Sequence, residues 1–181
     1  DISENGIIVG QVNRYFGDTA VWTPDGRGGW SLTVLDGLLA TAINDAGTMF
    51  VGAGPLVSYL DTPVLWTRNG NSWERSDIGN WDPTLESALP NDVNNRGLIV
   101  GDHQSFEAGN HGWLFRDSAV SWLDDLLEPG SAGWHVERAL RINESGVILA
   151  DAIPDGGRAA QSVLLLPNDL TILAPRSGAA G

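Results

Sequence analysis

The sequence predicts an all-β fold, a β-propeller built from four repeats of about 41–50 residues with four short strands in each blade. Three observations predict it: a recurring turn, a recurring hairpin after each turn, and the lack of any stretch with a sustained helical period. A twisted sheet of four strands cannot bury both of its faces alone, so such sheets stack on their neighbours. We expect one domain over residues 1–181, with repeat units at approximately 1–34, 35–79, 80–127 and 128–173 and a tail at 174–181.

The recurring turn ends in glycine and is followed at once by a short apolar run. The turn glycines are 41, 50 and 49 residues apart, at Gly6, Gly47, Gly97 and Gly146. An Asn or Ser two or three residues before a glycine favours a tight turn, because its side chain bonds the backbone ahead and glycine accepts a positive φ. The turn therefore marks the joint between two antiparallel strands in every unit.

A hairpin follows each of these turns. A second apolar segment lies 16 to 19 residues after the glycine, and a third lies seven or eight residues further on, beyond a polar turn. In residues 65–73, LWTRNGNSW, this places Trp66 and Trp73 on the two sides of an Arg-Asn-Gly turn. Because the arrangement recurs, we expect the aromatic residues at these positions to pack within the sheets: Trp22, Trp30, Trp66, Trp73 and Trp122. A β-sandwich with accidental similarity between its halves is the alternative fold.

The first repeat is incomplete. In the other units a further apolar segment precedes the turn, whereas only Asp1 and Ile2 remain of that strand in the first unit. Either four blades close into a ring with one short blade, or the chain belongs to a longer propeller. Unpaired sheet edges invite pairing with another chain, so we expect self-association if the ring is open.

The composition excludes several classes of function. The chain carries 23 acidic and 10 basic residues and a formal net charge of -13. Such a surface repels phosphate groups, so neither nucleic acid nor an anionic membrane surface is an expected partner. No apolar run approaches the roughly 20 residues that span a bilayer, so membrane insertion is not expected either. The lack of cysteine excludes a disulfide framework, a thiolate metal site and a thiol nucleophile.

Two phrases carry a resemblance to a known family. Residues 40–52 read ATAINDAGTMFVG, and residues 20–22 read AVW. With them, the chain resembles the bacterial extracellular HAF-repeat proteins, and residues 122–143 look like the last repeat of that family. The resemblance implies a secreted or surface-displayed domain of propeller-like fold, with no established activity, cofactor or catalytic residue.

Trp81 is a candidate ligand-binding residue that the repeat does not explain. It lies in residues 79–83, GNWDP, an additional connection with no counterpart in the first unit. An exposed indole beside Asn and Asp side chains suits stacking on a sugar ring. The alternative is that the ring folds back over the edge of its blade, because large apolar rings seldom stay exposed without reason.

His103 and His111 flank residues 104–110, so in a hairpin their side chains meet near its base. With Trp81 they complete the expected ligand-binding set. If the chain is an enzyme, we expect both histidines to be catalytic together with Glu107 and Arg116, because imidazole is a general base and a guanidinium neutralises an acidic sugar. The alternative is a structural cluster held by hydrogen bonds.

The sequence predicts neither a metal site nor a cofactor. The two histidines are eight residues apart, which matches no specific metal spacing. Asp124, Asp125 and Glu128 form an acidic group without the alternating oxygen ligands of a calcium loop, so we interpret it as a solvated turn. No Gly-x-Ser-x-Gly motif occurs, and the glycines at 26–29 lie in a hairpin turn rather than between a strand and a helix.

These observations favour a non-catalytic module, secreted or displayed at the cell surface, that binds a glycan or another protein through loops at one end of its blades. Two alternatives stay open. One is a polysaccharide-degrading enzyme of propeller fold, a lyase or a hydrolase. The other is a structural subunit whose copies assemble through their blade edges.

Overall fold

The predicted all-β class is confirmed in the computed structural model, which describes residues 1–12, 18–35, 39–54, 62–81, 86–105, 109–167 and 170–174. These residues form fifteen β-strands and two short 3-10 helices, η1 (Asp124–Leu126) and η2 (Pro129–Ser131). Among the described residues, no helix is long and apolar enough to cross a membrane.

The strands form four antiparallel sheets, each made of strands that follow one another in the chain. The first sheet contains β1 (Ile8–Val12), β2 (Asp18–Pro24) and β3 (Trp30–Leu35). The second contains β4 (Leu39–Ile43), β5 (Met49–Ala53), β6 (Pro63–Asn69) and β7 (Ser72–Asp77). The third contains β8 (Glu86–Val93), β9 (Ile99–Ser105), β10 (Gly109–Arg116) and β11 (Ala119–Trp122). The fourth contains β12 (Trp134–Ile142), β13 (Ile148–Pro154), β14 (Gln161–Leu166) and β15 (Thr171–Leu173).

The first sheet has three strands where the others have four. A single antiparallel bridge between Ile2 and Ile8 stands at the place of the additional strand. This agrees with the expectation that the first unit begins at its second strand.

The recurring turn forms as the sequence predicts. Positive φ angles between 64° and 86° are found at all four turn glycines, Gly6, Gly47, Gly97 and Gly146. In the second unit the Asn44 side chain accepts hydrogen bonds from the backbone N–H groups of Thr48 and Met49, both at 2.9 Å. Asn94 and Asn143 accept corresponding bonds in the third and fourth units. The side chain thus replaces the backbone partners that a tight turn lacks.

A series of hydrogen bonds, here called the turn ladder, joins the turns of neighbouring sheets. The Asn5 side chain donates to the carbonyl oxygen of Ala46 at 2.8 Å, and the backbone N–H of Ala46 donates to Asn95 Oδ1 at 2.9 Å. The backbone N–H of Asn95 in turn donates to Glu144 Oε1 at 2.9 Å. Each of the first three turns is therefore bonded to the corresponding turn of the next sheet.

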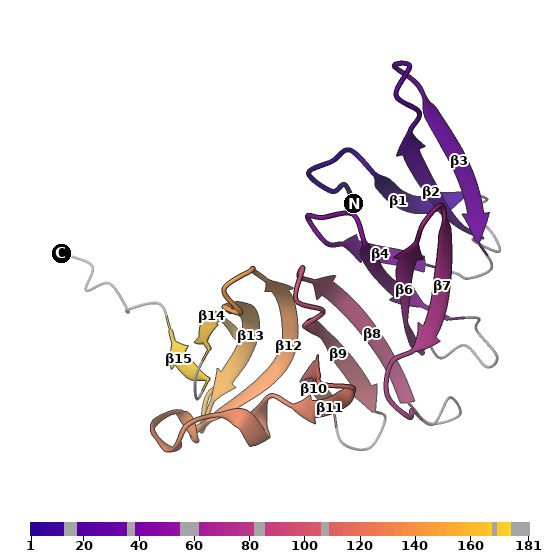
Figure 1. The fold of residues 1–181 in the computed structure, drawn as a ribbon. Helices are drawn as coiled ribbons and strands as arrows, with labels where there is room; N and C mark the ends of the chain where they lie inside the picture. Colours follow the sequence, from indigo (N-terminus) through magenta and orange to yellow (C-terminus); the bar gives the residue numbers. More distant parts are fainter. Residues whose placement is uncertain are drawn as a thin grey trace.

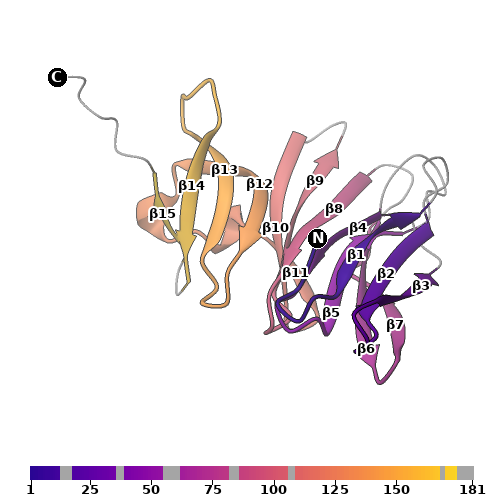
Figure 2. The same cartoon turned by 90° about the horizontal axis from the view of Figure 1, so that it is seen from above.

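The four sheets follow one another along a curved row, from β1–β3 (indigo) to β12–β15 (orange and yellow) (Figures 1 and 2). Each complete sheet packs its first strand, β4, β8 or β12, against the sheet before it. Val9, Val51 and Val100 occupy the same repeat position and are buried among residues of the following sheet. Leu149 holds that position in the fourth sheet and is 36% exposed, because no described sheet follows the fourth.

Apolar side chains are consequently exposed at both ends of the row. At the N-terminal outer face, Trp30, Leu32 and Val34 alternate along β3 and are 50–56% exposed. At the C-terminal outer face, Leu149 pairs with Leu164 across β13 and β14, and Leu164 pairs with Leu173 of β15. These leucines are 36–49% exposed. The same alternation that buries side chains between inner sheets leaves them uncovered at the two ends.

The tryptophans of the hairpin at residues 65–73 pack as expected. Trp66 is 1% exposed and stacks on Phe50, with ring centroids 4.7 Å apart and planes 11° apart. Trp73 meets the same phenylalanine edge-on at 4.8 Å. Trp30, expected to pack as well, is instead 56% exposed, because the first sheet has no sheet before it. Trp66 and Trp73 therefore stabilise their sheet and form no sugar-stacking platform.

Two glycines allow the first strand of a sheet to approach the second closely. A side chain at Gly52 would overlap the carbonyl oxygen of Leu39, and one at Gly101 would overlap the carbonyl oxygen of Leu89. Both carbonyls lie near a register shift in β4 or β8, where a β-bulge bends the strand. The repeated Val-Gly dipeptide thus carries a steric requirement at its second residue.

Candidate functional site

The strands of all four sheets end on two opposite sides of the molecule, which differ from the two outer faces described above. The turn end carries the four turn glycines and the turn ladder, and the opposite end, here called the loop end, carries the candidate histidines. His103 and His111 are directly paired across β9 and β10, so their side chains share one face of the third sheet. This is the arrangement that the sequence predicted for the base of the hairpin.

Trp81 lies over the same part of the sheet. Its indole N–H donates to the carbonyl oxygen of Ile78 at 2.6 Å, and its ring stacks on His103 with centroids 5.3 Å apart. Gly79 has a φ of 75°, and a side chain there would meet the rings of Trp81 and the methyl group of Val120. The ring is therefore folded back over its sheet, as one alternative expected, and it stays partly exposed.

Trp122 connects the three candidate residues. Its ring centroid lies 5.8 Å from that of Trp81, 5.1 Å from that of His103 and 5.6 Å from that of His111. Trp81 and Trp122, both partly exposed, line a hollow of about 330 Å³ together with Gly79, Asn80 and Val120. The predicted ligand-binding residues thus gather at one place.

His103 lies beneath this hollow rather than on its surface. It is 3% exposed and is covered by the rings of Trp81 and Trp122. Its position suits support of the two indoles and excludes direct contact with a ligand in this conformation. His111 is more accessible and lies on the other side of Trp122, towards the fourth sheet.

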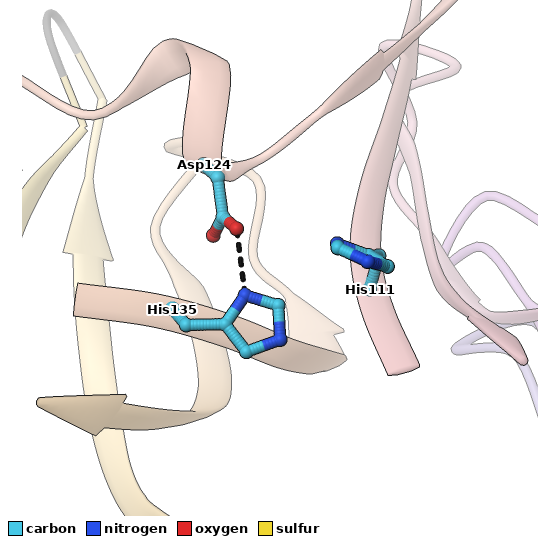
Figure 3. A group of neighbouring side chains, drawn as sticks. All are labelled: His111, Asp124 and His135. Carbon is cyan, nitrogen blue, oxygen red and sulfur yellow. Dashed lines mark hydrogen bonds and ion pairs between the residues drawn. The ribbon is translucent and has the colours of Figure 1, made fainter. Parts of the chain in front are cut away.

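His111 faces two residues that the sequence analysis did not connect with it (Figure 3). His135, from β12, meets His111 edge-on with ring centroids 4.9 Å apart. Asp124, from η1, lies 2.7 Å from His135 Nδ1 through its Oδ2 atom. An imidazole held by a carboxylate can accept a proton or bind a cation, so this group has the chemistry of a base or of a metal ligand set.

Arg116, the other described residue of the expected catalytic set, lies elsewhere. Arg116 is at the turn end of β10, five residues from His111 and therefore roughly 16 Å away along the strand. There it lines, with Arg96, a separate pocket of about 430 Å³ between the third and fourth sheets. Glu107 lies outside the described residues. Arg116 and the two predicted histidines can therefore contact the same substrate only if that substrate is long enough to span this distance.

A pocket of about 580 Å³ lies where the first strands converge at the turn end. Charged residues from all four sheets line it: Asp1, Asp45, Asp92, Arg141 and Glu144. Asp92 accepts a hydrogen bond from the backbone N–H of Ile142 at 2.8 Å and so joins the third and fourth sheets. Burial raises the pKa of Asp92, although the hydrogen bonds from Ile142 and Val93 act in the opposite direction. The Asp92 carboxylate therefore has a structural role, since it joins strands of the third and fourth sheets.

Asp124 and His135 are the site residues that sequence reasoning missed. Asp124 belonged to an acidic group interpreted as a solvated turn, and His135 had no part in any motif. The small number of histidines could have drawn attention to His135, because the chain has only three and the other two were already candidates.

The site stands alone as a basis for assigning function. No protein-family model matches the chain, and no curated protein matches it significantly. The function is therefore argued from the geometry at the loop end.

Proposed function

We propose that the chain is a secreted or surface-displayed β-propeller module that binds a neutral glycan without acting on it, in the hollow between Trp81 and Trp122. The four stacked antiparallel sheets, of three or four strands each, support this architecture. The resemblance to extracellular HAF-repeat proteins supports a location outside the cell. The formal charge of -13 disfavours acidic sugars and leaves neutral ones.

The observation that carries this proposal is the pair of partly exposed indoles in one hollow. A sugar ring presents C–H groups on its face, which pack well on an aromatic ring with one polar edge. Asn80, exposed at the same hollow, offers an amide that both donates and accepts hydrogen bonds, as sugar hydroxyl groups require. The volume of about 330 Å³ is that of a small-molecule site.

Replacing Trp81 by alanine is expected to weaken glycan binding about tenfold or more, which corresponds to roughly 1.4 kcal/mol or more of lost stacking and packing. The measurement is an array of neutral hexose and pentose oligosaccharides, followed by calorimetric titration of the best binder. Asn80→Ala is the second variant, because its exposed side chain can be removed without disturbing the core. Trp30→Ala removes an exposed indole from another sheet and is the matched control. Binding that survives both Trp81→Ala and Asn80→Ala, or no binding to the array, would contradict the proposal.

The two outer faces favour assembly as a second function. The C-terminal outer face is equivalent to the face with which each earlier sheet contacts the sheet after it. The N-terminal outer face is equivalent to the face with which each later sheet contacts the sheet before it. The contact between these two kinds of face occurs three times within the chain. We infer that a second copy of the chain covers them, so that the row continues from one molecule into the next.

The expected result is a mass above that of the monomer, rising with concentration, in light scattering of the full chain. Leu32→Asp places a charge on the N-terminal outer face and is expected to return the protein to a monomer. Ser31→Asp, exposed on the opposite face of the same strand, is the matched control and leaves assembly unchanged. A monomer at every concentration would exclude this function.

A further inference from the structure

Three side chains from three different elements meet at the loop end, in the seam between the third and fourth sheets. They are His111 of β10, Asp124 of η1 and His135 of β12. One ligand atom of each lies within 4.8 Å of the corresponding atoms of the other two. In Figure 3, His111 lies on one strand with its ring turned towards the Asp124–His135 pair on the neighbouring elements.

The contacts of His135 leave one of its ring nitrogens facing a carboxylate oxygen. Its Nε2 atom lies 2.9 Å from the carbonyl oxygen of Asn110, and its Nδ1 atom lies 2.7 Å from Asp124 Oδ2. Both partners are oxygens that accept hydrogen bonds, yet a neutral imidazole has only one N–H. In the tautomer whose Nε2–H donates to Asn110, the Nδ1 lone pair and Asp124 Oδ2 are two electron-pair donors turned towards the same space, as two ligands of one ion are.

The same contacts orient the ring for metal binding. A histidine that binds a metal through one nitrogen commonly donates its other N–H to a backbone carbonyl or a carboxylate, which determines the tautomer and the ring orientation. The contact of Nε2 with Asn110 fits this role and leaves Nδ1 as the ligand atom.

Asp124 is held in place for the same purpose. Its Oδ1 atom accepts a hydrogen bond from the backbone N–H of Val136 at 2.7 Å, which leaves Oδ2 turned towards His135. The preceding residue, Leu123, is fully buried and donates its backbone N–H to the carbonyl oxygen of Gly112 at 3.0 Å. The carboxylate is thus anchored from both sides before any ion arrives.

We propose that His111, Asp124 and His135 bind a divalent transition-metal ion, with Zn²⁺ as the best fit. Two imidazole nitrogens and one carboxylate oxygen suit Zn²⁺, whereas Ca²⁺ and Mg²⁺ prefer oxygen ligands alone. Two atoms bound to one Zn²⁺ lie at most about 4.2 Å apart, because each bond is about 2.1 Å long. Forming the site therefore needs small side-chain rotations that bring His111 nearer and separate Asp124 Oδ2 from His135 Nδ1, which lie 2.7 Å apart. The three residues are only partly buried, so the ion has access and a fourth position is open to water or to a ligand.

This proposal is independent of glycan binding, because the metal ligands and the Trp81–Trp122 hollow share no residue. The test is calorimetric titration of ZnCl₂ into the full chain after treatment with a chelator, together with the visible absorption of the Co²⁺-loaded protein. The wild-type chain is expected to bind one Zn²⁺ and to give the d–d bands of Co²⁺ bound by nitrogen and oxygen ligands.

His111→Gln and Asp124→Asn each remove one ligand while keeping the size of the side chain. Each is expected to weaken Zn²⁺ binding at least tenfold, since loss of even an outer partner of a ligand costs about 10- to 100-fold. Asp125→Asn is the matched control, because Asp125 is the exposed neighbour of Asp124 and outside the ligand set. Circular dichroism of each variant verifies that the sheets are intact.

Three results would overturn the proposal. The first is a wild-type chain that shows neither Zn²⁺ binding nor Co²⁺ bands. The second is Zn²⁺ affinity that His111→Gln and Asp124→Asn leave at the wild-type level, which would place the ion elsewhere. If Asp125→Asn lost affinity as strongly as Asp124→Asn, the acidic surface in general would be binding the ion, and the assignment of ligands would be wrong.

Discussion

Replacing Trp66 by alanine is expected to lower the free energy of unfolding by about 3–5 kcal/mol. The side chain is 1% exposed and stacks on Phe50, so its removal leaves a cavity between the first two sheets as well as lost apolar burial. Domains of this size have a total stability of only about 5–15 kcal/mol, so the variant is close to unfolding. Urea denaturation followed by circular dichroism measures the change.

Trp30→Ala is the matched control for this prediction. Trp30 is 56% exposed on the N-terminal outer face, so its removal from the monomer is expected to cost less than about 1 kcal/mol. The comparison is made at low protein concentration, where copies of the chain do not cover that face. Equal losses in the two variants would mean that burial in the monomer does not determine the contribution of these tryptophans.

Replacing Gly101 by alanine is expected to lower the free energy of unfolding by about 3 kcal/mol, the upper end of the cost of overpacking. The new methyl group would overlap the carbonyl oxygen of Leu89 and the ring of Trp113, which is fully buried. A backbone carbonyl in a paired strand cannot move aside as a flexible side chain does. Urea denaturation of the variant and the wild-type chain provides the measurement.

Gly10→Ala tests whether this cost is local. Gly10 occupies the same repeat position as Gly101, but the first sheet lacks the strand whose carbonyl would be struck. Among the described residues, an added methyl group there meets the ring of Trp22, at 3.4 Å. The expected change is below about 1 kcal/mol, and alanine gains some stability by restricting the unfolded chain. A loss similar to that of Gly101→Ala would disprove the steric explanation.

The sheets could be predicted because the residues that determine each turn and its two strands are close together in the sequence. Asn44, three residues before Gly47, accepts hydrogen bonds from the backbone of Thr48 and Met49. One short segment therefore determines the turn and the two strands beside it. Repetition then identifies the same stretch in other units. Trp30 shows the limit of this reasoning, since an equivalent position implies an equivalent environment only where a neighbouring sheet is present.

The candidate site was predictable only within one hairpin. His103 and His111 face each other across β9 and β10, and their spacing in the sequence was enough to bring them together. Asp124 and His135 reach His111 through the packing of the fourth sheet on the third, which no periodicity encodes. For Trp81 the sequence predicted either a ring folded back over its sheet or a ring exposed to a ligand. The ring is folded back on His103 and also lines a hollow, so it has features of both.

The turn ladder also divides the molecule into a frame of turns of constant length and a rim of connections of differing length. The turns that carry it, before β5, β9 and β13, each contain five residues, whereas the loop-end connections into β2, β6, β10 and β14 contain three to nine. Insertions and deletions at the loop end leave the hydrogen bonds of the ladder in register. Surface connections of this kind tolerate such changes and commonly carry function. A change in the length of a loop-end connection can therefore alter a ligand site there while the stack of sheets is kept.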